Sequence, residues 1–194
     1  MHWRHRTMRR PAINTPGHAH VLTFSCYRRY KFLTKDRTCE WLAEAINEAR
    51  LDLGFQLWAY VFMPEHVHLL IWPFRPVYDV RSILHAIKAP VGRKAVEYLR
   101  DAAPEWLPRI TVAKKQRVRR YFWQPGGGFD SNEIEPLAIF ALIDYIHNNP
   151  VRRELVARPE DWRWSSAGWC EGKNSLVPDF MDLGGLTGFF RGQE

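Results

Sequence analysis

The chain has 194 residues, of which 46% are hydrophobic and 25% are charged, and these values suit one folded domain and exclude disorder as the dominant state. Lysine and arginine number 28 against 21 acidic residues, and the net charge of +7 favours a polyanionic partner without establishing one. The three cysteines form no C-x-x-C pair, which excludes a disulfide framework and a cysteine zinc site and fits a reducing compartment. The sequence shows neither a secretory signal nor the ~18-residue apolar run of a spanning helix, so we expect a cytoplasmic protein with no membrane partner.

The first half of the sequence predicts strands and one helix. Residues 20–28 are rich in β-forming residues and predict a strand. Residues 36–50 place their apolar side chains on one helical face, with an aspartate near the start and an arginine at the end. Two further β-rich runs, 55–62 and 66–72, flank the tripeptide M-P-E, and this arrangement predicts a hairpin.

The second half predicts mainly helices. Residues 79–101 have a helical pattern that we expect to be interrupted at Pro90. Residues 109–120 carry six cations and no acid, and Gly126–Gly128 predict a flexible joint. Residues 136–149 give the clearest helical pattern, which the following proline should end, because proline disfavours helical geometry in the residue before it.

This order of elements predicts an α+β fold in which helices pack on a central, mainly antiparallel sheet. The ferredoxin-like sandwich is the commonest arrangement of this kind. We expect a basic N-terminal arm over residues 1–16, a single domain over 17–170 and a glycine-rich C-terminal tail over 171–194.

The first candidate site is the pair His66 and His68. Side chains alternate along a strand, so both imidazoles face one side while Val67 faces a core on the other. Two histidines on one face can chelate a metal ion. The same spacing occurs at His18 and His20, so it equally suits two packing histidines.

The second candidate site lies on the last predicted helix. Tyr145 and Asn149 are four residues apart and project from one face of that helix. A tyrosine hydroxyl beside an amide oxygen forms a candidate nucleophile site. The alternative is a core tyrosine with Asn149 as a C-terminal cap.

Together the two sites support a chemical hypothesis. Two imidazoles and one amide oxygen are three neutral ligands, which leave positions on a divalent cation for a phosphate group and water. Tyr145 would attack the polarised phosphate and form a covalent phosphotyrosine that conserves the bond energy for rejoining.

Beyond this chemistry, three segments occur in a fixed order: M-P-E-H-V-H-L-L at 63–70, Y-I-H-N-N-P-V-R at 145–152 and W-R-W-S-S-A at 162–167. Through them the chain resembles the REP-associated tyrosine transposases of the HUH single-strand transposase group. The segments G-H-A-H-V-L-T-F-S-C-Y-R-R at 17–29 and W-Q-P-G-G-G at 123–128 are also similar to that family. The resemblance covers most of the chain, from about residue 17 to 168, and the ordered combination of motifs is highly specific.

The resemblance implies a ferredoxin-like HUH sandwich whose catalytic tyrosine lies on a C-terminal helix, and makes 17–170 the catalytic domain. It implies that His66 and His68 bind the metal and that Asn149 occupies the position of a third ligand. Tyr145 then becomes joined to a 5′ phosphate of single-stranded DNA. The implied enzyme cleaves and rejoins single-stranded DNA beside hairpins such as REP palindromes, and it uses Mg²⁺ or Mn²⁺.

Other residues are candidates for supporting roles. Glu65 either orients an adjacent imidazole or is a solvated turn residue. The basic clusters are candidate DNA contacts. For each cluster taken as a group, we favour contact with DNA over the alternative of a solvated basic face. They comprise Arg4, Arg6, Arg9, Arg10, Arg28, Arg29, Lys31, Lys114, Lys115, Arg117, Arg119, Arg120 and Arg152.

The leading interpretation is therefore a metal-dependent single-tyrosine transposase that acts on hairpin-bearing single-stranded DNA. The main alternative is a non-cleaving hairpin-DNA-binding protein domesticated from a transposase. A third possibility is a nuclease that uses activated water, and its cleavage activity would survive Tyr145→Phe. The sequence fits a monomer as well as a homodimer in which Tyr145 of one chain serves the histidine pair of the other.

Overall fold

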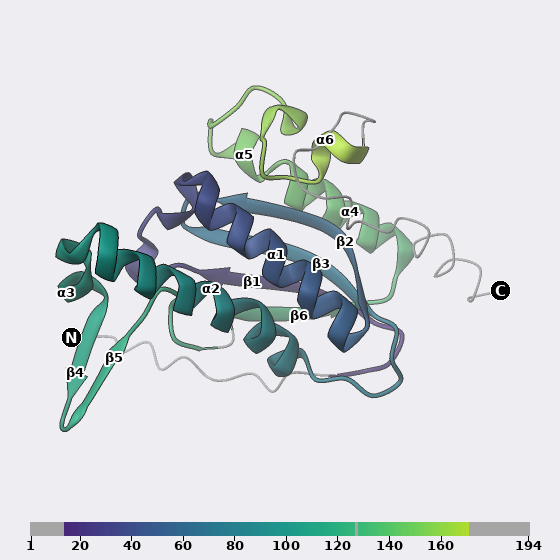
Figure 1. Ribbon diagram of the computed structural model, residues 1–194. Helices are drawn as coiled ribbons and strands as arrows, with labels where there is room; N and C mark the ends of the chain where they lie inside the picture. The colour runs from purple at the N-terminus through teal and green to yellow at the C-terminus, as the bar shows by residue number, and fades with distance from the viewer. Residues whose placement is uncertain (1–13, 127, 171–194) are drawn as a thin grey trace, which may run out of the picture.

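A computed structural model describes residues 14–126 and 128–170 of the protein. The arm residues Arg4, Arg6, Arg9 and Arg10 and the tail 171–194 lie outside these residues. The strands are β1 (Ala19–Ser25), β2 (Phe55–Met63), β3 (His66–Pro73), β4 (Thr111–Lys114), β5 (Arg117–Arg120) and β6 (Phe129–Glu133). The helices are α1 (Asp36–Leu53), α2 (Val80–Ala102), α3 (Leu107–Ile110), α4 (Pro136–His147), α5 (Asn149–Arg152) and α6 (Ala167–Cys170) (Figure 1).

The central sheet has four antiparallel strands in the order β2-β3-β1-β6. Along the chain its elements run β1-α1-β2-β3-α2-β6, and this order together with the strand order is the ferredoxin-like arrangement. The predicted α+β fold, with helices packed on an antiparallel sheet, is therefore confirmed. The two inner strands are β3 and β1.

Helices cover both faces of the sheet (Figure 1). Helices α1 and α2 pack on one face over the larger apolar cluster, which includes Leu22, Leu42 and Ile87. Helix α4 packs on the other face over a smaller cluster, to which it contributes Ile139 and Ile146. The fold is thus a three-layer structure in which most of the apolar core lies on the α1/α2 face.

Alternation along β3 divides its side chains between the two faces. Val67, Leu69 and Ile71 lie in the larger core, as predicted. Leu70 lies in the smaller core, on the α4 side. Because His66 and His68 share the parity of Leu70, they too project toward α4.

A β-bulge in β2 changes which of its residues face each layer. The register with β3 shifts between Leu57 and Ala59. Leu57 belongs to the larger core, but Trp58 and Ala59 both belong to the smaller one, and Tyr60 returns to the larger. The extra residue places the buried Trp58 beneath α4.

Helix α1 ends at Leu53, three residues later than predicted, and three other elements also differ from the prediction. The first strand ends at Ser25 instead of residue 28, because Arg28 and Arg29 have φ values of 51° and 56° that no strand can accommodate. Helix α2 continues through Pro90 without interruption. The buried Ile87 and Val91 on either side of that proline pack against the sheet, and this burial compensates for the lost hydrogen bond.

The third difference is at the last long helix, which ends at His147, two residues earlier than predicted. Pro150 takes the first turn of the separate helix α5, where a missing N–H is tolerated. Between α2 and β6, the basic segment for which no element was predicted forms the β4–β5 hairpin.

Gly128 follows this hairpin and lies close to β1. Its φ is 82°, and a Cβ there would come within 2.2 Å of the carbonyl oxygen of Thr23. Only glycine fits this approach, so the end of the predicted flexible joint is packed against the sheet.

The W-R-W-S-S-A segment fastens the chain after α5 to the outer edge of β2. The backbone of Phe62 donates to Trp164, and that of Ser166 donates to Tyr60. The indole of Trp162 donates to the carbonyl of Phe62. These bonds satisfy an otherwise open sheet edge, so this segment has a structural role. No helix within the described residues is long and apolar enough to cross a membrane.

Candidate active site

The two histidines of β3 converge on one point of the α4 face. Their Nε2 atoms are 3.1 Å apart, and their rings are nearly perpendicular at 85°. Both are buried, with exposed fractions of 8% for His66 and 7% for His68. The predicted pairing of the imidazoles on one strand face is thus present in the structure.

Each ring is held through its other nitrogen. The hydroxyl of Thr23 on β1 lies 2.8 Å from His68 Nδ1, and Glu65 Oε1 lies 3.2 Å from His66 Nδ1. An ionised carboxylate can only accept, so the proton of His66 resides on Nδ1 and its Nε2 carries the lone pair. Thr23 was not among the predicted residues, because only the register of β1 with β3 places it opposite His68.

The electrostatics of the site favour neutral imidazoles beside an ionised carboxylate. Burial lowers the pKa of His66, and lowers the pKa of His68 to about 4. Burial acts to raise the pKa of Glu65, but the hydrogen bond from Arg153 and the proximity of His66 outweigh it, so that pKa is lowered. Neutral imidazoles are the form that binds metal ions.

This donor set fits a divalent cation. Two imidazole nitrogens bound to one ion at ~2.1 Å, with an angle of roughly 90–110° at the metal, lie about 3.0–3.4 Å apart. The observed 3.1 Å between the Nε2 atoms lies within that range. The described residues contain no cluster of three His, Cys, Asp or Glu side chains that could hold a metal, and the third donor predicted from the sequence is an amide.

Tyr145 lies beside this pair in the same chain. Its ring centroid is 6.0 Å from that of His68, in an edge-to-face arrangement of 83°. The residue is 44% exposed, so a large substrate can reach it. The guanidinium of Arg152 lies 5.1 Å from the centroid of the tyrosine ring. A candidate nucleophile and a cation thus adjoin the two imidazoles.

Asn149 is fixed one helical turn after Tyr145. Its amide nitrogen donates to the carbonyl of Tyr145 at 2.7 Å and to that of Ile146 at 3.4 Å. With the nitrogen committed to α4, the amide oxygen is the atom available as a cation donor. The hydrogen bonds of Asn149 connect it to the tyrosine helix and not to the imidazoles.

Glu65 links the histidine pair to the chain beyond α5. It is 5% exposed, and its Oε1 accepts a hydrogen bond of 2.6 Å from Arg153. Arg29 approaches the same oxygen at 3.7 Å. No role beside Glu65 was predicted for Arg153, because the ion pair joins residues 88 positions apart, a separation at which sequence gives no signal.

His147 has a different role. It is buried, and its Nε2 lies 2.8 Å from the hydroxyl of Ser166. Burial lowers its pKa to about 4. The residue therefore fastens α4 to the segment along β2, which agrees with its omission from the predicted metal site.

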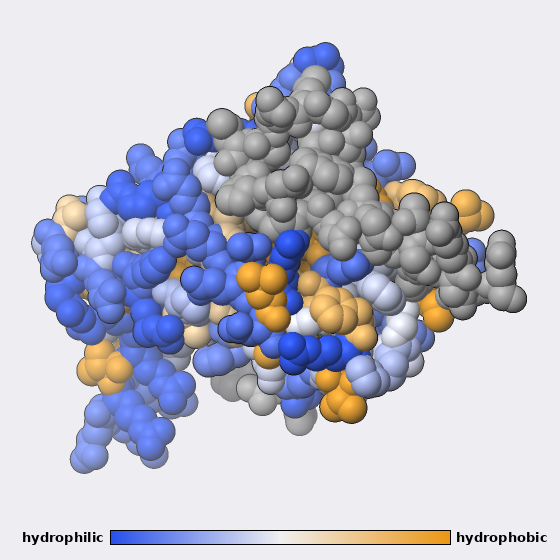
Figure 2. Space-filling view, turned by 45° about the vertical axis from the view of Figure 1, so that its right-hand side comes forward, coloured by the Kyte–Doolittle hydropathy of each residue, from blue (hydrophilic) through white to orange (hydrophobic). Residues whose placement is uncertain are grey.

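The remaining cations form separate groups. The hairpin carries Lys114, Lys115, Arg117, Arg119 and Arg120, all exposed. It projects away from the sheet and from α4, and its surface is mostly hydrophilic, with Val118 as an exposed apolar residue (Figures 1 and 2). The turn after β1 carries Arg28, Arg29 and Lys31, which are also exposed. Its Tyr27 contacts Tyr121 at the base of the hairpin, with ring centroids 5.4 Å apart.

The register of the hairpin sorts its cations by face. Lys114 pairs with Arg117, and Val112 with Arg119, so Lys114, Arg117 and Arg119 share one face. Like charges directly opposite each other destabilise a strand pair. Within the described ranges no ion pair joins these side chains to a carboxylate. A polyanion would relieve this repulsion.

Comparison with known proteins gives three findings. Residues 15–149 match the model of a family described as "Transposase IS200 like". A solved REP-associated tyrosine transposase bound to a REP hairpin is 23% identical, over 90% of this chain and 93% of that chain, with a TM-score of 0.64. A structure described as a "putative transposase from Deinococcus radiodurans R1" is 18% identical, over 72% of this chain and 94% of that chain, with a TM-score of 0.44. No curated protein matches the sequence.

Proposed function

The chain belongs to the IS200-like transposase family, and on this premise we propose that it cleaves and rejoins single-stranded DNA through Tyr145. The observation that carries the proposal is the convergence, within one chain, of two imidazole Nε2 atoms 3.1 Å apart and a tyrosine ring 6.0 Å from His68. A core tyrosine would not be 44% exposed beside a buried histidine pair. In this proposal Tyr145 serves the histidines of its own chain.

The proposed reaction is a phosphoryl transfer to tyrosine. The Tyr145 oxygen forms a bond to phosphorus as the bond from phosphorus to the 3′ oxygen of the preceding nucleotide breaks. The hydroxyl proton is lost to solvent, and the departing oxygen takes up a proton to become a free 3′ hydroxyl. The 5′-phosphotyrosine conserves the bond energy, so a 3′ hydroxyl can later reverse the step and release Tyr145.

His66 and His68 would hold a divalent ion, Mg²⁺ or Mn²⁺, with the amide oxygen of Asn149 as a third donor. When bound there, the ion supplies Lewis-acid polarisation of the phosphate. Thr23 and Glu65 keep the two imidazoles in orientation, and Glu65 is itself held by Arg153. Arg152, next to the tyrosine ring, would counter the negative charge that develops on the phosphate.

The proposed substrate is DNA with a hairpin, the ligand of the solved REP-associated relative. The β4–β5 hairpin supports this choice, because a two-stranded ribbon fits the major groove of a duplex stem. Its cationic face would contact phosphates of that stem. The cations at 28–31 would then contact the DNA between the stem and the active site.

The proposal is tested by a covalent adduct assay. Labelled hairpin oligonucleotides from the flanks of the protein's own gene are incubated with the full chain and Mn²⁺ or Mg²⁺, then resolved on a denaturing gel. We expect an adduct with the wild type and with Tyr30→Phe, a control that keeps the ring, and none with Tyr145→Phe or His66→Ala. Cleavage without an adduct that survives Tyr145→Phe would overturn the tyrosine mechanism in favour of a hydrolytic nuclease. Binding without cleavage would favour the domesticated DNA-binding protein.

The hairpin contacts are tested by salt dependence. Each phosphate contact contributes roughly 0.9 to the slope of log affinity against log salt for duplex DNA. Lys114→Ala combined with Arg117→Ala should therefore lower the slope by about 2 on a stem-containing probe. The matched double variant Arg81→Ala with Arg100→Ala, two exposed cations on α2, should leave it unchanged. Equal slopes for both double variants and the wild type would contradict the assigned contact.

A further inference from the structure

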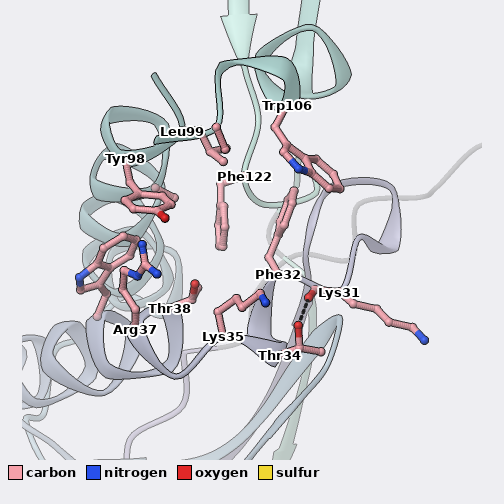
Figure 3. Close-up of a pocket in the computed structure, with 13 residues that line it drawn as sticks. Lys31, Phe32, Thr34, Lys35, Arg37, Thr38, Tyr98, Leu99, Trp106 and Phe122 are labelled. Atoms are coloured by element: carbon pink, nitrogen blue, oxygen red, sulfur yellow. Dashed lines mark hydrogen bonds between the residues drawn. The ribbon is translucent and has the colours of Figure 1, made fainter. Parts of the chain in front are cut away.

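A pocket of about 480 Å³ lies on the α1/α2 side of the sheet, away from Tyr145. It opens between the start of α1, the end of α2 and the turn after β1 (Figure 3). Its volume is within the range of small-molecule sites, about 300–1,000 Å³. Neither the histidine pair nor the proposed reaction uses it.

Aromatic side chains form its walls. Figure 3 shows Tyr98 on one side, Phe32 and Trp106 on the other, and Phe122 at the back. Phe32 stacks on Phe122 with centroids 4.9 Å apart and meets Trp106 edge-on at 5.6 Å. These contacts hold the walls in place from within the protein. Flat apolar walls of this kind suit a planar ring.

The polar lining consists almost entirely of hydrogen-bond donors. Lys31, Lys35 and Arg37 contribute cations and the two threonines contribute hydroxyls, and among the described residues that line the pocket none has a carboxylate or amide side chain. The guanidinium of Arg37 lies 3.9 Å from the centroid of Tyr98 and extends that wall. Thr34 already donates its hydroxyl to the carbonyl of Lys31. A ligand that offers acceptors and carries negative charge complements this lining.

Among the parts of a DNA strand, an unpaired keto base has these properties. Thymine, the keto base without an amino group, presents two carbonyl oxygens to the ammonium and guanidinium donors, whereas the amino groups of guanine, adenine and cytosine would find only hydroxyl acceptors. The adjoining phosphates would lie against Lys31 and the positive start of the 18-residue helix α1.

We propose that this pocket binds one unpaired thymine of the DNA on which the protein acts. The inference rests on the DNA-binding part of the proposed function. It adds a recognition site on the face opposite the nucleophile, so one DNA molecule would contact both faces of the sheet. Paired bases are excluded, since only an unstacked base can enter between the walls.

Binding is measured by fluorescence anisotropy of labelled 12-mers of thymidine, of deoxyadenosine and of abasic nucleotides with the full chain. Trp106→Ala should weaken thymidine binding roughly tenfold, the effect of one stacked base, and change abasic binding less than twofold. Lys35→Ala, at an exposed position where folding is not affected, should reduce the preference for thymidine over deoxyadenosine to about one. Phe74→Ala, an exposed aromatic outside the pocket, is the control and should change neither. Equal losses on thymidine and abasic probes, or no loss on either, would overturn the proposal.

A second measurement locates the base directly. A thymidine 12-mer containing one 5-iododeoxyuridine is photo-crosslinked to the wild type, and the modified peptide is identified by mass spectrometry. We expect attachment to Phe32, Tyr98 or Trp106, and attachment only outside these residues contradicts the pocket. The adduct assay separates the two proposals. An adduct with base-independent binding overturns only the pocket, whereas base-dependent binding without any adduct overturns only the tyrosine reaction.

Discussion

The two faces of the sheet differ in what they bury. On the α1/α2 face, side chains of β1, β2 and β3 meet helices in a large apolar core. On the α4 face the apolar cluster is small, and it shares the surface with two histidines, a glutamate and an asparagine. Since successive residues of β3 serve opposite faces, one strand carries both the packing that stabilises the fold and the groups that carry the chemistry.

This division implies that substitutions at neighbouring positions of β3 have different consequences. A change on one face should lower the stability of the fold, and a change at the next residue should lower activity. The larger core can hold the strand rigid without being part of the site. The α4 face can then keep polar side chains buried, because each has a partner on a strand or helix that the core already fixes. The predictions below test how complete this separation is.

The largest effect is expected for His68→Ala, which removes one of the two converging imidazoles. Mn²⁺ affinity, measured by isothermal titration, should fall at least about 100-fold, since a ligand contributes more than the partners that orient it. The free energy of unfolding in urea should change by no more than about 1–2 kcal/mol. Unchanged Mn²⁺ affinity would mean that the pair is not the metal site.

Leu69→Ala changes the next residue of β3, which faces the opposite layer. Removing a fully buried leucine from the larger core should lower the free energy of unfolding by about 2–5 kcal/mol. The Mn²⁺ affinity of the folded protein should stay within about twofold of wild type, because the α4 face keeps its groups. A parallel loss of metal binding would show that the two faces are not separable.

Thr23→Val tests the cross-strand support of His68. Valine matches threonine in shape but removes the oxygen that lies 2.8 Å from Nδ1. We expect Mn²⁺ affinity to fall by roughly tenfold, the lower range for loss of an orienting partner. Thr34→Val, which removes an exposed hydroxyl elsewhere, serves as the control. Equal affinities of both variants and wild type would show that Thr23 does not position the imidazole.

Ser166→Ala is expected to change stability alone. Its hydroxyl accepts from the backbone of Tyr60 at 2.9 Å and lies 2.8 Å from His147 Nε2. Losing these buried partners should cost about 1–3 kcal/mol of unfolding free energy in a urea titration. Mn²⁺ binding should remain intact, because the bond fastens α4 to the edge of β2 and does not touch the histidine pair. A change in metal affinity larger than in stability would refute this purely structural role.

Much of the candidate site was predictable because it depends on local periodicity. The alternation of β3 indicated that His66 and His68 share a face, and the helical repeat indicated that Tyr145 and Asn149 project together. Whether these residues bind a metal and attack DNA stays a prediction. The predicted ends of the first strand and of α4 were less accurate. The positive φ values of Arg28 and Arg29 and the short helix at Pro150 are set by surrounding contacts, which local periodicity does not show.

The sequence by itself determined the class of fold, the order of its elements from β1 to α2 and the faces on which the histidines and the tyrosine lie, but it gave no signal for β4, β5 and β6. These follow from backbone geometry, which repeats every two residues in a strand and every 3.6 in a helix. Only the tertiary structure decided that Thr23 supports His68 across 45 residues, that Arg153 reaches Glu65, and that Phe32, Tyr98 and Trp106 enclose one pocket. Such contacts join distant segments, and they are fixed by strand register and helix packing, which no local pattern of residues encodes.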